Sequence, residues 1–185
     1  MKIAIVKLTS ASPLSFGRRH VTPKLAKELD NAYEMRTWRE KLHVTKDGEV
    51  FIPPMALKNA LSEAAKFLAM KIPGKGNSNY TKHFESGLLI TEPILLGIHK
   101  DDVTHEVYFV PSNGERGGGK RVDKAFPVIP SWKGSTTIFV LDDIIEKEVL
   151  KQVLEACGQF IGLGRFRPQR NGFYGRFAAK VVSFG

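Results

Sequence analysis

Residues 158–185 read GQFIGLGRFRPQRNGFYGRFAAKVVSFG, and this stretch combines glycines, arginines and aromatic side chains. Glycines bracket Arg165, Arg167 and Arg170, and aromatic residues are interleaved with these cations. Glycine permits close backbone approach, arginine offers a planar fork to phosphate, and an aromatic face can stack an unpaired base. The stretch therefore predicts a phosphate-holding glycine-rich segment, residues 158–171, followed by the last strand of a sheet.

Length and charge limit what this stretch belongs to. The chain has 185 residues, of which 42% are hydrophobic, so we expect a single domain over residues 1–185 with one well-buried core. A net charge of +9 favours polyanionic partners through counterion release. A basic protein without a specific nucleic-acid site is the alternative, because net charge does not inform on fold. The lone Cys157 excludes an internal disulfide and a cysteine-based zinc cluster.

The N-terminal residues MKIAIVKLTS form an apolar run that breaks at Lys7. This run is too short for a signal peptide or a membrane span. The sequence therefore predicts a cytoplasmic protein with no membrane partner.

Hydrophobic periodicity predicts six core elements in the order strand, helix, strand, strand, helix, strand. They span Lys2–Thr9, Pro54–Met70, Gly87–Ile98, Ser135–Leu141, Ile144–Cys157 and Phe173–Phe184. This order is typical of an α+β, ferredoxin-like (RRM-like) fold, an antiparallel sheet with two helices on one face. The first strand has apolar residues on both faces, which predicts a central position. The fold class alone does not decide the function.

Local signals suggest where the remaining elements begin and end. Thr22 followed by proline predicts the start of a helix over Thr22–His43. Asp142 and Asp143 suit the start of the last helix, and Gly158 suits its end. Prolines interrupt Phe126–Trp132, which predicts an edge strand.

Three basic segments, residues 10–50, 71–85 and 111–124, are predicted as insertions into this plan. The second is rich in glycine, asparagine and lysine, and the third places three consecutive glycines beside Lys120 and Arg121. Either loop fits a nucleic-acid contact or, alternatively, a solvated connection between strands.

Three motifs resemble those of a known family. The opening strand is followed by SPLSFG at Ser12–Gly17, and Phe51–Leu61 reads FIPPMALKNAL, similar to the motif IPGSSLKGxxR. The ending Leu154–Phe177 resembles a glycine-rich loop and last strand. The family that these motifs resemble is the RAMP superfamily of CRISPR-associated RNA-binding proteins. Pro54, Met55 and Asn59 depart from the pattern, and the chain is short, so a minimal or phage-borne relative fits as well as a standard backbone subunit.

The resemblance implies binding of a single-stranded, guide-like RNA along its sugar-phosphate backbone. Its partners would be other CRISPR-type protein subunits, or further copies of the chain assembled along the RNA. By motif position and charge, the RNA-binding residues are predicted to be Arg18, Arg19, His20, Lys58, Lys75, Lys82, Lys120, Arg121, Gly162, Gly164, Arg165, Arg167, Arg170, Tyr174 and Arg176. From strand alternation we expect Phe177 inside and Tyr174 or Arg176 outside.

Catalysis is the second hypothesis. RAMP processing nucleases cut RNA by general acid–base chemistry at the 2′-hydroxyl, and the candidate groups here are His20, His83, Asp30 and Asp123. None lies in a spacing that demands catalysis, so we expect a non-enzymatic protein. No His, Cys or Asp cluster has metal-ligand spacing, and no cofactor is expected. A subunit-mimicking inhibitor of CRISPR complexes is a further alternative, as is a generic single-strand binder unrelated to CRISPR.

Overall fold

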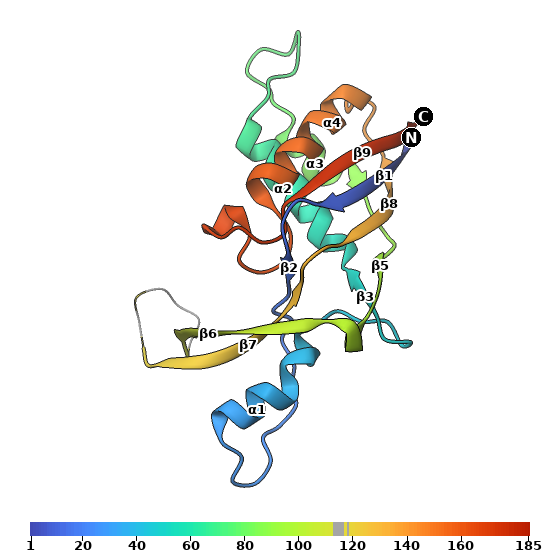
Figure 1. Cartoon of the computed structure of the whole chain (residues 1–185). Helices are drawn as coiled ribbons and strands as arrows, with labels where there is room; N and C mark the ends of the chain where they lie inside the picture. Colours follow the sequence, from blue (N-terminus) through green and yellow to red (C-terminus); the bar gives the residue numbers. More distant parts are fainter. Residues whose placement is uncertain (113–116, 118) are drawn as a thin grey trace.

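A four-stranded antiparallel sheet forms the centre of the computed structural model, which describes residues 1–112, 117 and 119–185 (Figure 1). Its strands, in spatial order, are β4 (Leu88–Leu89), β8 (Lys133–Val140), β1 (Lys2–Ser10) and β9 (Phe177–Phe184). β1 pairs antiparallel with both β8 and β9, so its predicted central position is confirmed.

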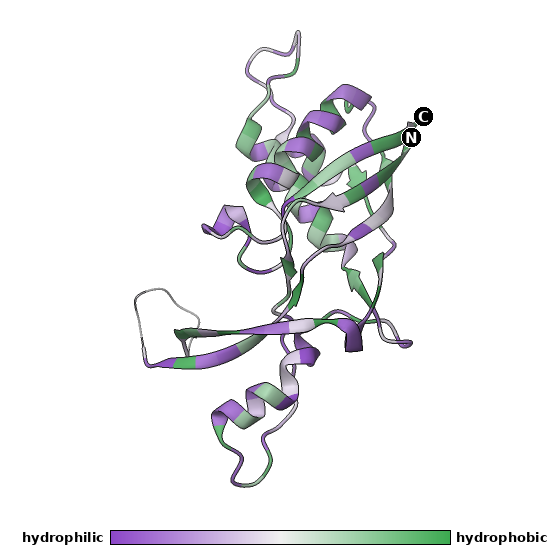
Figure 2. Cartoon of the chain, viewed as in Figure 1, coloured by the Kyte–Doolittle hydropathy of each residue, from purple (hydrophilic) through white to green (hydrophobic). Residues whose placement is uncertain are grey.

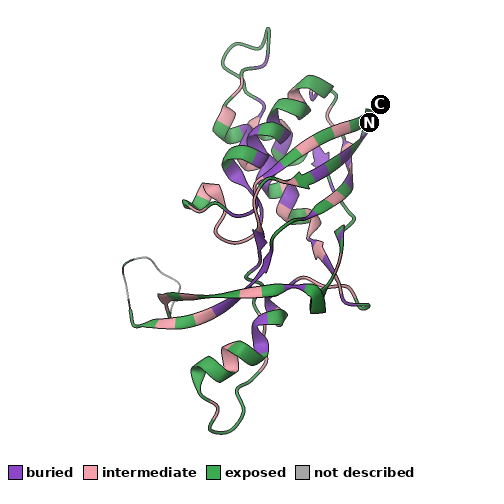
Figure 3. Cartoon of the chain, viewed as in Figure 1, coloured by how far each residue is buried: buried purple, intermediate pink, exposed green. Residues whose placement is uncertain are grey.

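Two helices, α2 (Pro54–Leu68) and α4 (Lys147–Ala156), contribute their apolar sides to the same core as β1. Figure 3 shows the buried residues gathered where these elements meet, and Figure 2 shows apolar and polar residues alternating around the two helices. The most buried members are Ala4, Val6 and Leu8 of β1, Leu57 and Leu61 of α2, and Leu150 and Leu154 of α4. The other face of β1 is open, because Ile3 and Ile5 are 38% and 41% exposed.

The predicted ferredoxin-like fold is confirmed by the order of these elements. Along the chain they run β1, α2, β4, β8, α4, β9, and in the sheet they stand β9, β1, β8, β4. β8 is thus inserted antiparallel between β1 and β4, as in a split βαβ unit.

Two smaller sheets are built from the segments between these core elements. One contains β2 (Leu14–Ser15), β7 (Arg121–Ile129) and β6 (Thr104–Pro111), and the other contains β3 (Glu49–Ile52) and β5 (Ile94–His99). The remaining short helices are α3 (Thr81–Ser86), η2 (Lys100–Asp102) and η4 (Pro168–Arg170). The β6–β7 hairpin crosses the lower part of the molecule in Figure 1. The prediction of an edge strand at 126–132 is wrong, because β7 lies between β2 and β6.

The helix predicted over Thr22–His43 is shorter. It consists of α1 (Asp30–Thr37) and the 3-10 turn η1 (Trp38–Lys41). The Thr22 hydroxyl does not cap a helix, because it donates to the carboxylate of Glu40. Lys27 has a φ of 62°, which is incompatible with a continuous right-handed helix.

Two other predicted elements also differ. Gly87–Ile98 is not one strand: it divides at Pro93 into β4 and β5, which belong to different sheets. The last helix does not end at Gly158, since it continues as the π-helical turn η3 (Cys157–Ile161). A Cβ atom on Gly158 would lie 1.9 Å from the carbonyl oxygen of Phe177, so this glycine lets β9 approach the turn.

Of the glycine-rich loop predicted at 111–124, residues 113–116 and 118 lie outside the described residues. Across the ranges that are described, no helix is both long enough and apolar enough to cross a membrane.

Candidate nucleic-acid interface

A pocket of about 270 Å³ lies where the segment after β2, the β6–β7 hairpin and the glycine-rich segment meet. We call it the cationic pocket, because five basic side chains line it together with His20 and a single carboxylate, that of Glu34. The basic residues are Arg18, Arg19, Lys41, Lys124 and Arg165. Residues that are distant in the sequence therefore form one concentrated positive surface.

Arg165 is the central cation of this pocket. Its guanidinium carbon lies 3.8 Å from the ring centroid of Phe126 and 4.5 Å from that of Phe166, so two aromatic faces position it. Its Nε is buried without a hydrogen-bond partner, and no described carboxylate forms an ion pair with it. Burial lowers the pKa of Arg165, and the charge of Glu34 offsets this only partly. A partly dehydrated guanidinium with no anionic partner favours binding of an anion.

Two glycines allow Arg165 to reach this position. The Arg165 amide donates to the carbonyl oxygen of Ser15 at 2.7 Å, which fixes the glycine-rich segment beside the segment after β2. Gly164 has a φ of 73°, and a Cβ there would lie 2.3 Å from that oxygen. A Cβ on Gly17 would lie 3.2 Å from Nη1 of Arg165. Gly164, in the segment predicted to allow close approach, thus approaches the chain's own backbone at Ser15, whereas Gly17 leaves room for the Arg165 side chain.

The carboxylate of the pocket, Glu34, is engaged by a structural contact. Lys41 Nζ donates to Glu34 Oε2 at 2.5 Å and to the carbonyl oxygen of Ala125 at 2.7 Å. The Ala125 amide donates to the same carboxylate oxygen at 3.1 Å. Burial lowers the pKa of Lys41, and Glu34 counteracts that shift. This ion pair attaches α1 and η1 to β7, and the charges of its two members compensate each other.

The other cations of the pocket face solvent. The side chains of Arg18 and Arg19 are exposed, and neither forms an ion pair with any described residue. Lys124 Nζ donates to the carbonyl oxygen of Ser112 at 2.9 Å, a neutral acceptor that leaves its charge uncompensated. The net charge of the pocket is therefore strongly positive.

An aromatic cluster joins the glycine-rich segment to the β6–β7 hairpin. The Tyr174 hydroxyl donates to Glu106 Oε2 at 2.9 Å and is hydrogen-bonded to the Tyr108 hydroxyl. The Phe166 ring centroid lies 5.2 Å from that of Tyr108. Burial raises the pKa of both tyrosines. The cluster sets the distance between Arg165 and the hairpin that carries the opposite wall of the pocket.

Of the two residues of which one was expected outside, Tyr174 is 4% exposed and so lies inside, whereas Arg176 is half-buried. The alternation used for that prediction does not apply, because residues 172–176 form a turn and β9 begins only at Phe177. Phe177 is buried, as predicted. Phe173, which is 55% exposed and stacks on Tyr174 at 4.4 Å, offers the open aromatic face instead.

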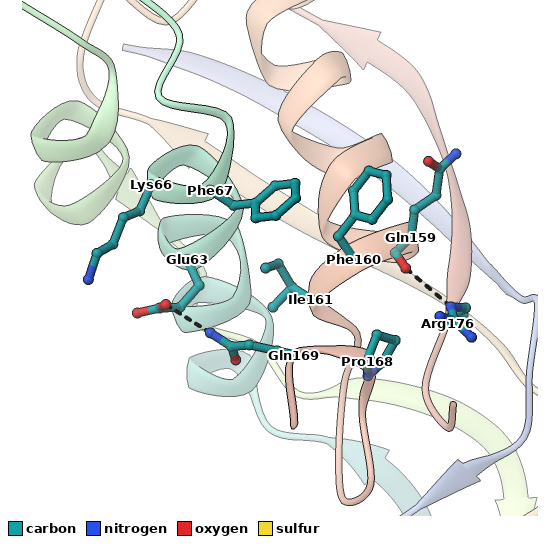
Figure 4. A pocket seen from close by; sticks show the side chains of 9 residues that line it. All are labelled: Glu63, Lys66, Phe67, Gln159, Phe160, Ile161, Pro168, Gln169 and Arg176. Atoms are coloured by element: carbon teal, nitrogen blue, oxygen red, sulfur yellow. Dashed lines mark hydrogen bonds between the residues drawn. The ribbon is translucent and has the colours of Figure 1, made fainter. Parts of the chain in front are cut away.

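Arg176 lies in a different pocket, between α2 and η3 (Figure 4). Its Nε donates to the carbonyl oxygen of Gln159 at 3.1 Å. The exposed rings of Phe67 and Phe160, which both line this pocket, lie next to each other with centroids 5.1 Å apart. The pocket has a volume of about 520 Å³ and is mainly apolar, so it differs in chemistry from the cationic pocket.

The other arginines and Gly162 lie in or next to the glycine-rich segment but outside the lining of the cationic pocket. Arg167 is half-buried near the Cys157 thiol, whose pKa is raised by burial and is lowered to a smaller extent by this guanidinium. Arg170 is exposed. Gly162, with a φ of 73°, ends the π-helical turn.

The predicted lysines lie apart from this pocket. Lys58 donates to Ser62 Oγ and to the carbonyl oxygens of Phe84 and Glu85, at 3.2, 3.0 and 2.8 Å, and so closes the end of α3. Burial lowers its pKa, and Glu85 partly opposes the shift. Lys75 and Lys82 belong to the loop before α3 and to α3 itself, at the end of the molecule opposite the hairpin in Figure 1.

Lys120 and Arg121 stand at the start of β7, near the end of the hairpin. The Arg121 guanidinium donates to the carbonyl oxygen of Phe109 at 3.0 Å. The structure thus brings Arg18, Arg19 and His20 together with Arg165, whereas Lys120 and Arg121 are not part of the lining of the cationic pocket. It adds Lys41, Lys124 and Phe126, which no motif in the sequence indicates.

The catalytic candidates are dispersed. His83 of α3 lies outside the cationic pocket, and its Nδ1 is 2.6 Å from Asp142 Oδ2, a contact that lowers the pKa of Asp142. His20 Nδ1 lies 3.4 Å from a carboxylate oxygen of Glu40. Asp30 pairs with Lys24, which lowers its pKa, and Asp123 is an exposed residue of β7. Within the described ranges, no three His, Cys, Asp or Glu side chains are grouped so that they could hold a metal ion.

Two solved structures share this architecture. One is a chain of the type III-B Cmr-beta bound to cognate target RNA, with a TM-score of 0.52 and 14% identity over 99% of this chain and 61% of that chain. The other is Cmr6 from Pyrococcus furiosus, with a TM-score of 0.51 and 12% identity over 97% of this chain and 99% of that chain. No protein-family model matches the sequence, and no curated protein matches it significantly.

The chain therefore shares its fold with these Cmr proteins, and at the level of the fold this agrees with the resemblance seen in its motifs. The chain spans about three fifths of the length of the first of them, 61%.

Proposed function

We propose that this protein binds single-stranded RNA as a subunit of a CRISPR-type ribonucleoprotein and that it has no catalytic activity of its own. The observation that carries the proposal is the half-buried guanidinium of Arg165, which lies beside Arg18 and Arg19 and forms no ion pair with a carboxylate in the part of the chain that the structure describes. The shared fold with Cmr proteins, one of them solved bound to target RNA, supports it.

The chemistry of the cationic pocket suits a sugar-phosphate backbone. Arginine donates two parallel hydrogen bonds to phosphate oxygens, and partial burial strengthens such contacts. The exposed ring of Phe173 offers a stacking face in the turn that follows the glycine-rich segment. A paired base cannot stack on a side chain without leaving its duplex, so this combination favours a single strand.

A binding assay with a labelled 20-nucleotide RNA over a range of salt concentrations tests this proposal. Replacement of Arg18 and Arg19 by alanine removes two exposed cations of the pocket. We expect weaker binding and a salt slope smaller by about 1.4, at about 0.7 per phosphate of a single strand. The matched control is the double variant Lys75→Ala and Lys82→Ala, which removes the same charge at the opposite end of the molecule.

The control variant is expected to bind RNA within about twofold of the wild type, since exposed charges more than a Debye length away are screened. If both double variants reduced the affinity for RNA equally, binding would depend on the net charge alone, which would contradict the proposed site. Tighter binding to duplex RNA than to the single strand would contradict the preference for single strands.

One observation favours a second candidate, a metal-independent ribonuclease. The contact of 2.6 Å between His83 and Asp142 is of the kind that orients an imidazole for general base catalysis. We expect no cleavage when end-labelled RNA is incubated with the protein in EDTA. Discrete products that disappear in the variant His83→Ala would establish the ribonuclease instead.

A further inference from the structure

A second basic pocket, of about 620 Å³, adjoins the cationic pocket. The two pockets share Arg18, Arg19 and His20, which line both of them. The second one, which we call the flanking pocket, is also lined by Arg39 of η1 and Lys100 of η2. A surface of positive charge thus continues from one pocket to the other.

The cations of the flanking pocket are positioned and uncompensated. The Arg39 guanidinium carbon lies 4.2 Å from the centroid of the Trp38 ring. Trp38 is 3% exposed, and its other neighbour is the His105 ring at 4.6 Å, so the platform beneath Arg39 is fixed. In the part of the chain that the structure describes, neither Arg39 nor Lys100 forms an ion pair with a carboxylate.

Both acids of this pocket have partners of their own. The Glu40 carboxylate accepts a hydrogen bond from Thr22 and lies 3.4 Å from His20 Nδ1. Asp101 Oδ2 lies 3.3 Å from His99 Nδ1. Four basic residues, of which two also line the cationic pocket, therefore outnumber two acids that already have partners.

Apolar side chains also line the flanking pocket, those of Val21, Leu42 and Val44. Val21 is 89% exposed, whereas Leu42 is fully buried and lies beneath the surface. Such a pocket complements a nucleotide. The basic side chains suit the charged phosphate, and the apolar side chains suit the flat face of the base.

We propose that an RNA strand held in the cationic pocket passes over Arg18–His20 into the flanking pocket, where Arg39 and Lys100 hold the phosphates of neighbouring nucleotides. This inference rests on the proposed function, because it extends the same bound strand. The shared wall is the reason for one continuous path, since a ligand of either pocket contacts the same two arginines.

The test is a length series of labelled oligouridylates, from three to twelve nucleotides, measured with the double variant Arg39→Ala and Lys100→Ala. For the longest RNA we expect about tenfold weaker binding and a salt slope smaller by about 1.4, for two lost phosphate contacts. For the shortest RNA, which fits the cationic pocket alone, we expect no change. Arg165→Ala is expected to weaken binding at every length.

The control is the double variant Lys66→Ala and Lys151→Ala, two exposed lysines of α2 and α4. The inference is overturned if the flanking-pocket variant reduces the affinity for the longest RNA no more than this control does. The proposed function still stands in that case, provided that Arg165→Ala reduces the affinity. Equal weakening at all lengths overturns the continuous path. No effect from Arg165→Ala contradicts the proposed function itself. The single variant Lys100→Ala, at an exposed surface position, repeats the measurement without disturbing the Trp38 platform.

Discussion

Replacement of Arg165 by alanine separates a role in RNA binding from a role in folding. The side chain forms no ion pair with the described residues, and its contacts are the two aromatic rings at 3.8 and 4.5 Å. Loss of a partly desolvated cation–π contact costs about 1 kcal/mol. For a chain of this length, that cost lowers the melting temperature by roughly 2–4 °C. The protein should therefore remain folded at 25 °C.

The effect on RNA binding is expected to be larger. A hydrogen bond to a charged group contributes about 1.5–3 kcal/mol, which corresponds to roughly 10- to 150-fold in the dissociation constant. The salt slope should fall by about 0.7, for the loss of one phosphate contact. Arg165→Lys keeps the charge but loses the planar fork, so we expect an intermediate affinity with an unchanged salt slope.

Fluorescence anisotropy with a labelled RNA at several salt concentrations measures both quantities, with circular dichroism to confirm folding. Arg167→Ala is the matched control, because it removes the same charge from the same segment at a position that does not line the cationic pocket. A change of less than twofold for Arg165→Ala, or equal effects of the two variants, would refute the assignment of Arg165 as the central phosphate ligand.

Three further predictions concern the scaffold. Glu34→Gln leaves the buried ammonium of Lys41, whose side chain is 9% exposed, without its carboxylate, and should cost about 3 kcal/mol in the free energy of unfolding, measured by urea titration; an unchanged midpoint contradicts the structural role of this pair. Gly158→Ala places a methyl group 1.9 Å from the Phe177 carbonyl oxygen and should cost about 3 kcal/mol or more; a melting temperature within 2 °C, or roughly 1 kcal/mol, of the wild type would show that β9 lies elsewhere. Burial lowers the pKa of His43 below its usual value of 6.5, and the charge of Arg18 is a smaller cause. The folded state therefore favours the neutral imidazole, and the stability that this contributes above pH 6.5 is lost as the pH falls toward the folded-state pKa. His43→Phe should reduce the fall in melting temperature between pH 7 and pH 5, and an unaltered pH dependence excludes this group as its source.

The sequence by itself determined the core of the fold. Short-range periodicity predicts the strand at Lys2–Thr9, the helix that begins at Pro54 and the order of the six core elements. These predictions hold in the structure because β1, α2 and α4 each bury one continuous face. The sequence also indicated the stretch around Arg165 and the basic residues after the first strand as candidate RNA contacts. Glycines and arginines that stand close together without acidic neighbours can be recognised in the sequence itself.

Only the tertiary structure decided how the site is assembled. Lys41 Nζ reaches the carbonyl oxygen of Ala125, 84 positions away along the chain, and periodicity carries no information about such a contact. Tyr174 lies inside because the Gly175 turn, with a φ of 73°, directs it toward Glu106 before the last strand begins. Whether an arginine lines a pocket or forms an ion pair with a carboxylate depends on which distant elements pack beside it. Such packing is a property of the folded chain.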